Sequence, residues 1–554
     1  MWKMKKNSFI EGTLIATLSI VLVKSMGLLY VIPFYSVVGK QGGALYGYAY
    51  NIYSMFIVLS TTGIPIAISK IISEYNTLGY LEAKVRAFKI GKRIVNFTAI
   101  LSFVILFTFA RSIASIIIGD LTGGNTIEDV TVVIRAISFA VLVIPYLSLT
   151  RGYLQGHKFI TPSSRSQIIE QLVRVSIIII GSFLTYRVLK LSLTTTVAVA
   201  VTGAFFGGLV AVSYLSIKMK KNKEKLGFNY DQKDNITTKE IIRKLAQYTV
   251  PYIVLNLGAQ LYTFVDMVLV LRTLGHVGYA APDVEFIASA ISTWALKFNL
   301  IISSLAVGLA ISLIPNIVQS FVKNDWKDVK LKINQTLEMI VVIALPLTIG
   351  ISFLAEPIWT IFYGYSAVGS SVLRFSIYTA LFNTLYLAII AILQGLNKFK
   401  VAYITGIGGF LLNALLDVPL MMLFHKIGLP AYLGAISATV IGYSFSVIFS
   451  LKHLKDKHNV SYKPAIKVSV ITLIPITCMI LVLLGLNIFV PFDAQNKLSS
   501  LLTLIIKSTL GGGVYLFISY KIGLLERIFG KSNLERILRK VTFNKFEIGN
   551  QNED

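Results

Sequence analysis

The chain has 554 residues, of which 55% are hydrophobic and 14% are charged. A soluble chain carries roughly 25% charged residues, so this composition excludes a soluble globular protein. In a soluble protein, the formal net charge of +26 would suggest nucleic-acid binding. Here the basic residues are concentrated on one side of the membrane that the predicted helices cross, so we expect no nucleic-acid partner.

Apolar runs recur along the whole chain, and each is long enough to cross a hydrocarbon core of about 30 Å. A transmembrane barrel would show short alternating segments instead. We therefore predict an all-α polytopic membrane protein with about fourteen transmembrane helices. The predicted spans are 9–38, 46–73, 88–110, 132–153, 166–186, 193–217, 245–272, 286–318, 334–354, 371–395, 399–424, 431–451, 465–490 and 498–520.

Lysine and arginine residues are distributed unequally between the two sides of these spans. With the amino terminus in the cytoplasm, the inside segments carry 39 of the 52 basic residues and the outside segments carry eight. By the positive-inside rule, this bias predicts a multi-pass protein of the cytoplasmic membrane with both termini on the cytoplasmic side.

Two halves of the chain resemble each other at an offset of about 240 residues, as the strings LQGHKF (154–159) and LQGLNKF (393–399) illustrate. Six plus six spans in one orientation predict two parallel repeats with the substrate site at their interface. We therefore predict an N-lobe of helices 1–6 (1–217), a basic cytoplasmic linker (218–244), a C-lobe of helices 7–12 (245–455), helices 13–14 (456–520) and a cytoplasmic tail (521–554).

The tail has apolar residues at helical spacing with interleaved basic residues, which is typical of an amphipathic helix on the inner leaflet. A generic basic anchor is the favoured interpretation, and a regulatory role is the alternative.

Three motifs are distinctive: KSMGLLYVIPF at 24–34, GIPIAISK at 63–70, and RGYLQG at 151–156 with SQIIEQLVRV at 166–175. They resemble motifs of the SpoVB/MurJ-like flippases of Gram-positive bacteria, in the multidrug/oligosaccharidyl-lipid/polysaccharide exporter superfamily. The resemblance covers the whole chain, including two helices after a twelve-helix core. It implies a flippase that moves lipid II, the undecaprenyl-pyrophosphate-linked peptidoglycan precursor, to the outer leaflet by alternating access.

Some lysines lie inside predicted spans, where a charge costs at least about 2.5–3.5 kcal/mol and usually faces a cavity or a partner. Lys24 in span one and Lys297 in span eight come from opposite repeats, and we expect them to converge on one cavity and bind the pyrophosphate. Snorkelling or pairing with a carboxylate is the alternative. The resemblance implies that both occupy positions of functional arginines in related flippases. Tyr30, which replaces a further arginine, and Asn299 complete the predicted site.

Other intramembrane charges have more than one interpretation. Glu170 and Arg174 are four residues apart, which favours an intrahelical ion pair over a gate. Arg151 is expected to bond backbone carbonyls or acidic gate residues. Asp266 and Asp417 are equal candidates for pairing with a cavity lysine or for binding a coupling cation.

The last predicted spans lie outside the repeat, and the resemblance implies that they cradle the undecaprenyl chain. Lys507 lies within span fourteen, where a charge facing only lipid is costly. We therefore assign Lys507 to this lipid-tail groove.

No enzyme motif is present: the chain has no H-E-x-x-H and no P-loop, and its one cysteine, Cys478, lies inside a span. We therefore expect a transporter without metal or cofactor, driven by an ion gradient, the membrane potential or substrate consumption. The alternatives are a flippase for another undecaprenyl-linked polysaccharide, a cation-coupled multidrug exporter, which needs an acidic cavity, and a membrane glycosyltransferase, which needs a large outside loop. The expected partners are lipid II, membrane lipids and the cell-wall synthesis machinery, and we expect a monomer.

Overall fold

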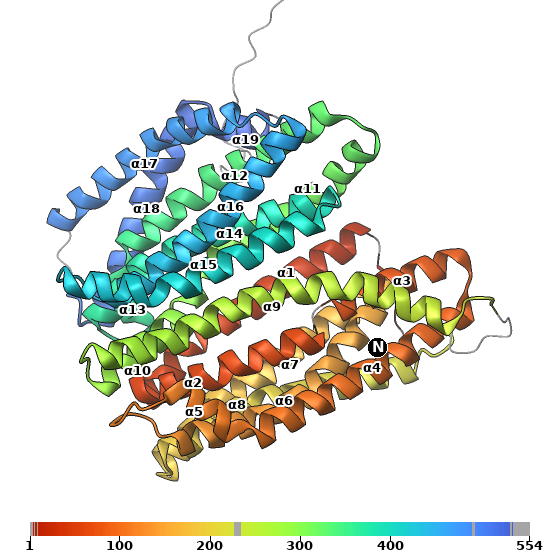
Figure 1. Cartoon of the computed structure of the whole chain (residues 1–554), viewed down its shortest axis with the longest axis horizontal. Coiled ribbons are helices and arrows are strands. Elements are labelled where there is room, and N and C mark those ends of the chain that lie inside the picture. The colour runs from red at the N-terminus through yellow and green to blue at the C-terminus, as the bar shows by residue number, and fades with distance from the viewer. Residues whose placement is uncertain are drawn as a thin grey trace, which may run out of the picture. The chain divides into compact units, whose positions relative to one another are not determined.

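The computed structural model describes residues 4, 6–7, 9–61, 63–226, 234–489, 493–531 and 534–535, and in these ranges the chain is helical without strands (Figure 1). The first unit is built mainly from α1 (Phe9–Leu29), α2 (Val31–Thr61), α3 (Ile64–Leu78), α4 (Leu81–Thr108), α5 (Ala110–Ile118), α6 (Ile127–Gly156), α7 (Ile160–Ser176), η1 (Ile177–Gly181), η2 (Leu184–Val188), α8 (Leu193–Lys220), α9 (Thr238–His276), α10 (Ala281–Ser289) and η3 (Ala290–Trp294).

The remaining helices are α11 (Leu296–Val322), α12 (Trp326–Phe353), α13 (Ala355–Tyr363), α14 (Ala367–Gly395), α15 (Phe399–Lys426), α16 (Tyr432–His458), α17 (Lys463–Phe489), α18 (Lys497–Lys521) and α19 (Leu524–Phe529). They form most of the second unit. Residues 296–297 of α11, 362–364 at the end of α13, and 406–442, which include parts of α15 and α16, belong to the first unit.

Thirteen stretches within the described ranges are long and apolar enough to cross a membrane. The first, Ile15–Leu78, contains 64 residues and would extend about 96 Å as one helix, which is about three bilayer cores. It is interrupted at Gly39 (φ 63°) and Gly63 (φ 85°), where only glycine adopts the backbone easily. The prediction of an all-α polytopic membrane protein with about fourteen spans is confirmed, and the side of the membrane on which the termini lie stays a prediction.

The units divide the chain differently from the sequence repeat. Helices α9 and α10, which the repeat assigns to the C-lobe, pack against α2 in the first unit, and α9 also packs against α3 and α4. Residues 227–233 of the predicted linker, 490–492 of the predicted segment with helices 13–14, and 532–533 and 536–554 of the predicted tail lie outside the described residues. The division into lobes, linker and tail stays a prediction.

Close packing of α6 on α3 explains the glycines of the RGYLQG motif. A Cβ atom on Gly152 would lie 2.4 Å from the carbonyl oxygen of Pro65, and one on Gly156 would lie 2.7 Å from that of Ser69. Because both obstacles are backbone atoms, larger residues at these positions would force the helices apart. The motif therefore fixes α6 directly against α3.

The corner between α6 and α7 is held by the amino-terminal segment. The Asn7 side-chain oxygen accepts hydrogen bonds from the amides of Ile160 (3.0 Å) and Thr161 (3.1 Å), which begin α7. At the same corner, His157 Nδ1 donates to the Tyr153 carbonyl oxygen at 2.9 Å, and its side chain is 1% exposed.

Burial lowers the pKa of His157 from 6.5 to about 4, so the folded protein holds it neutral. The unfolded chain binds a proton here below pH 6.5, so stability is complete above that pH and falls as the pH drops towards 4, by at most about 3 kcal/mol. The variant His157→Phe keeps an aromatic ring but cannot take up this proton. Between pH 7.5 and pH 4.5, we therefore expect the Tm of this variant to fall less than the Tm of the wild-type chain. Equal Tm losses would show that His157 does not control this titration.

In the second unit, α17 and α18 pack on each other and on α12 (Figure 1). Arg527 of α19 reaches back to Glu338 of α12 through two contacts of 2.8 Å, and Glu338 is buried. The hydrogen bond with Glu338 raises the pKa of Arg527. A bidentate pair of this kind orients as well as attracts, so it anchors the described start of the tail to the membrane helices.

Candidate functional site

Lys297 is positioned by the start of α11, directly after the π-helical segment η3, whose Trp294 is fully buried. Its ammonium donates to the Tyr30 hydroxyl at 3.3 Å and lies 5.0 Å from the centroid of the Tyr30 ring and 5.7 Å from that of Trp294. Lys297 is therefore held by aromatic faces and a phenol rather than by a counter-charge.

Further tyrosines extend this arrangement along α2. The hydroxyls of Tyr30 and Tyr46 are 3.2 Å apart, and the Tyr46 ring stacks on Tyr50 at 5.7 Å and on Trp294 at 5.9 Å. The guanidinium of Arg174, on α7, lies 5.3 Å from the centroid of the Tyr50 ring. We call Tyr30, Tyr46, Tyr50 and Trp294, with the cations Lys297 and Arg174, the tyrosine cage.

Neither cation of the tyrosine cage has a carboxylate oxygen within 4.0 Å among the described residues. Two cations at membrane depth without counter-charges are costly unless the site receives an anion. Guanidinium, ammonium and phenol groups all donate hydrogen bonds to phosphate oxygens. The cage is therefore suited chemically to an oxyanion with more than one charge.

The prediction that Glu170 pairs with Arg174 is wrong. Glu170 instead forms an ion pair of 2.8 Å with Arg151 of α6, whose Nε also donates to the Ser166 hydroxyl at 2.8 Å. This ion pair joins α6 to α7, so Glu170 does not pair with Arg174, whose guanidinium instead contacts Tyr50. A gating role for Arg151 and Glu170 stays a prediction.

The structure does not join Lys24 to the cage. Lys24 lies on α1 with an exposed side chain, and no hydrogen bond, ion pair or cation–π contact connects it to another described residue. Asn299 is buried and donates to the Thr379 hydroxyl at 3.3 Å within the second unit. Convergence of Lys24 with Lys297, and substrate contact by Asn299, stay predictions.

Asp266 and Asp417 lie together in the first unit. Asp266 accepts hydrogen bonds from the Asn413 amide (2.6 Å) and the Thr439 hydroxyl (2.9 Å), and Asp417 lies within hydrogen-bonding reach of Asp266. Asp417 is fully buried, and no other group in the described part of the chain donates to its carboxylate. Two buried carboxylates in contact repel each other unless they share a proton or a cation, so this oxygen-rich cluster is a candidate cation site.

Sequence reasoning missed the stacking tyrosines and the ligands around Asp266. Tyr46 and Tyr50 are one helical turn apart, as are Asn413 and Asp417, and this spacing places each pair on one helix face. That periodicity was the available signal. The contribution of Thr439 from α16 depends on packing alone.

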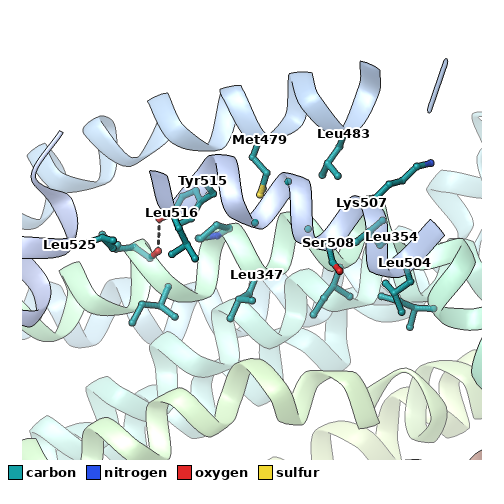
Figure 2. A pocket seen from close by; sticks show the side chains of 18 of the residues that line it. Leu347, Leu354, Met479, Leu483, Leu504, Lys507, Ser508, Tyr515, Leu516 and Leu525 are labelled. Carbon is teal, nitrogen blue, oxygen red and sulfur yellow. Dashed lines mark hydrogen bonds between the residues drawn. The ribbon is translucent and has the colours of Figure 1, made fainter. Parts of the chain in front are cut away.

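A cavity of about 420 Å³ lies in the second unit among α12, α17 and α18 (Figure 2). Its wall is almost wholly apolar and includes Leu347, Leu354, Met479, Leu483, Leu504 and Leu516. Lys507 stands at its edge, where its ammonium donates to the Asn487 side-chain oxygen at 2.6 Å. The cavity suits an apolar chain, and the partner of Lys507 explains how α18 tolerates a charge.

Two family models match the sequence: the one described as "Polysaccharide biosynthesis protein" matches residues 9–321, and MatE matches residues 251–418. The Lipid II flippase MurJ of Bacillus subtilis is 32% identical over 95% of this chain and 97% of its own length. The uncharacterized membrane protein YabM of the same organism is 26% identical over 97% and 98%. A solved structure of Lipid II flippase MurJ in an inward closed conformation matches 92% of this chain and 99% of its own with a TM-score of 0.63 at 17% identity, which shows the shared fold.

Proposed function

We propose that this chain, which belongs to the MurJ-like flippases of the multidrug/oligosaccharidyl-lipid/polysaccharide exporter superfamily, carries lipid II across the cytoplasmic membrane. It is a multi-pass protein of that membrane. Its characterised relatives are flippases and transporters, which supports transport of a lipid-linked glycan rather than enzymatic turnover.

The tyrosine cage is the observation that carries the proposal. Lys297 contacts Tyr30 and Arg174 contacts Tyr50, and Tyr46 links these two tyrosines. Neither cation has a carboxylate oxygen within 4.0 Å among the described residues, so the pyrophosphate of the substrate would supply the missing negative charge. The same cage argues against an organic cation as cargo, because like charges in a poorly solvated site repel strongly. A multidrug exporter is therefore the weaker alternative.

The cage does not select among glycans, because every undecaprenyl-pyrophosphate-linked precursor carries the same anion. Another such polysaccharide precursor is the second candidate. Expression of this chain in a strain depleted of its lipid II flippase separates the two: rescue of growth supports lipid II. Failure to rescue, with normal amounts of protein in the membrane, would favour another glycan.

We assign the coupling ion to the cluster of Asp266 and Asp417, with Na⁺ as the cation. The two carboxylates and the Thr439 hydroxyl supply hard oxygen atoms of the kind that such ions prefer, and the Asn413 side-chain nitrogen donates to Asp266 beside them. Bound Na⁺ would offset the repulsion between the two aspartates and couple its gradient to the conformational change.

Na⁺ should raise the Tm of the purified protein relative to choline at equal ionic strength, because a ligand that binds only the folded state stabilises it by about 2.7 kcal/mol at 100 times its Kd. Asp417→Asn should remove this Na⁺ effect, whereas Asp493→Asn, on a loop outside the cluster, should retain it. An equal Tm in Na⁺ and choline would instead indicate a proton shared by the two aspartates.

The apolar cavity beside α18 is the proposed groove for the undecaprenyl chain. A photoreactive polyprenyl phosphate should crosslink to α17 and α18, and Gly511→Leu, which narrows the cavity against Leu483, should reduce that crosslinking severalfold. Gly485→Leu, at a position with no neighbouring atoms within 4 Å, is the matched control. Crosslinks confined to other helices would contradict this assignment.

A further inference from the structure

The apolar cavity of the second unit has one wall that comes from outside the candidate membrane spans. Leu525 and Phe529 of the short helix α19 line it, together with residues of α12, α17 and α18. The α18 residues that line the cavity run from Leu504 to Leu516, which is about 18 Å along the helix axis. Figure 2 shows Leu516 and Leu525 towards one end of the cavity and Lys507 towards the other. Helix α19 therefore closes one end of an elongated groove.

Two sets of contacts hold α19 in this place. Leu524 is 3% exposed and packs with Val342 of α12 and Val468 of α17 in one buried cluster. Arg527 forms its bidentate ion pair with Glu338 of α12, with both contacts at 2.8 Å. Apolar packing and a pair of charges thus fix α19 to the same two helices that form the sides of the groove.

The carboxylate of Glu338 depends on Arg527 for its compensation. The Glu338 side chain is 4% exposed on a candidate membrane span, whereas that of Arg527 is 48% exposed. Within the described ranges, no second cation lies within 4.0 Å of this carboxylate. Removing one partner of a buried ion pair is strongly destabilising, because the other charge stays buried and unpaired. The ion pair therefore keeps α19 docked on α12.

The two sides of α19 differ in chemical character. Leu525 and Phe529 line the apolar cavity, whereas Glu526 and the following Lys531 border a depression that also contains Lys467 of α17. This separation is typical of an amphipathic helix at a membrane interface. Helix α19 thus presents an apolar end wall to the groove and keeps its charged side chains on the other side.

We infer that Arg527 and Glu338 are positioning residues for the polyprenyl chain: their ion pair holds α19 as the end wall of the groove, where Leu525 and Phe529 contact the chain. The inference rests on the proposed function, because it assumes that this cavity is the groove of a lipid-linked substrate. It gives the start of the tail a role in substrate binding, in place of that of a generic basic anchor. Loss of the pair should remove the contacts of α19 with the chain, while α12, α17 and α18 stay packed together.

Contact between α19 and the chain can be tested by replacing Phe529 in the purified full-length protein with the photoreactive amino acid p-benzoylphenylalanine. On irradiation, position 529 should crosslink to labelled undecaprenyl phosphate. The same replacement at Glu526, which borders the depression on the other side of α19, is the matched control and should crosslink severalfold less. An excess of unlabelled undecaprenyl phosphate should compete for the crosslink, and an equal excess of phosphatidylglycerol should not.

The ion pair is tested in the same background. Arg527→Glu should reduce crosslinking from position 529 at least about tenfold, because it places a second carboxylate against buried Glu338. Arg527→Lys should retain most of the crosslinking, since the opposite charge is kept. Lys531→Glu makes a similar change in charge on the other side of α19, and as the matched control it should leave the yield unchanged.

Three results would contradict the inference: no crosslink from position 529, equal competition by phosphatidylglycerol and undecaprenyl phosphate, or equal yields from the Arg527→Glu and Arg527→Lys variants. The groove itself is tested separately by the photoreactive polyprenyl phosphate. If that probe crosslinks to α17 and α18 while position 529 gives no crosslink, only the role of α19 is wrong. If that probe does not label α17 or α18 either, the proposed groove is wrong as well.

Discussion

Replacing Lys297 by alanine should abolish rescue of a strain depleted of its lipid II flippase, while the protein still reaches the membrane. Lys297 is one of two cations in the tyrosine cage, and its ammonium lies 3.3 Å from the Tyr30 hydroxyl with no carboxylate to replace the lost charge. Removing a charged donor to phosphate costs about 1.5–3 kcal/mol, and in a poorly solvated site the loss is greater.

Charge should decide the outcome at this position. Lys297→Arg should retain function because arginine also donates to phosphate oxygens, and Lys297→Glu should be more harmful than alanine because it repels the ligand.

The effects of Lys297→Ala and Arg174→Ala should be non-additive, since both substitutions remove side chains that bind the same anion. Lys40→Ala is a matched control, because Lys40 also lies over an aromatic ring, that of Phe286, but outside the cage. Normal rescue by Lys297→Ala would show that the lysine is structural.

Gly152→Ala should cause a large loss of stability for the addition of a single methyl group. The added Cβ would lie 2.4 Å from the carbonyl oxygen and 2.6 Å from the Cα of Pro65, and neither backbone atom can move without displacing α3. Overpacking of this kind costs typically about 1–3 kcal/mol or more, so we expect a lower Tm in detergent and less protein in the membrane.

Gly258→Ala is the matched control, because a Cβ at position 258 of α9 meets no atom within 4 Å. Alanine favours a helix over glycine by about 1 kcal/mol, so this variant should melt at the same temperature as the wild-type chain or slightly higher. Equal Tm values for the two variants would contradict the proposed backbone contact between α6 and α3.

Hydropathy was sufficient to predict the membrane helices, because apolar length is a local property of the sequence. The cost of a buried charge likewise led to Lys297 and to the pair of aspartates. The partner of Glu170 was predicted wrongly because four-residue spacing favours Arg174, whereas Arg151 approaches only through the packing of α6 on α7. Spacing in the sequence predicts only neighbours on the same helix, whereas packing between helices can bring a different partner closer.

The cage and the cation cluster show the same limit of sequence reasoning. The tyrosines at 46 and 50 lie on one predictable helix face, but the stacking of Tyr46 on Trp294 joins segments about 250 residues apart in the chain. The packing of α9 against α2 was also outside prediction, since the internal repeat assigns these helices to different lobes. Periodicity shows which residues share one face of a helix, but it does not show which helix faces pack against each other.

Exposure of lipid II on the outer surface of depleted cells is the most direct test of lipid II transport by this chain. An externally added enzyme that cleaves lipid II at its pyrophosphate reports the fraction that has crossed the membrane. Expression of the wild-type chain should make most of the lipid II cleavable, and Lys297→Ala at equal abundance should leave it protected. Lipid II that stays protected with the wild-type chain would show that this chain does not carry lipid II, and equal cleavage with both proteins would show that Lys297 is not needed for transport.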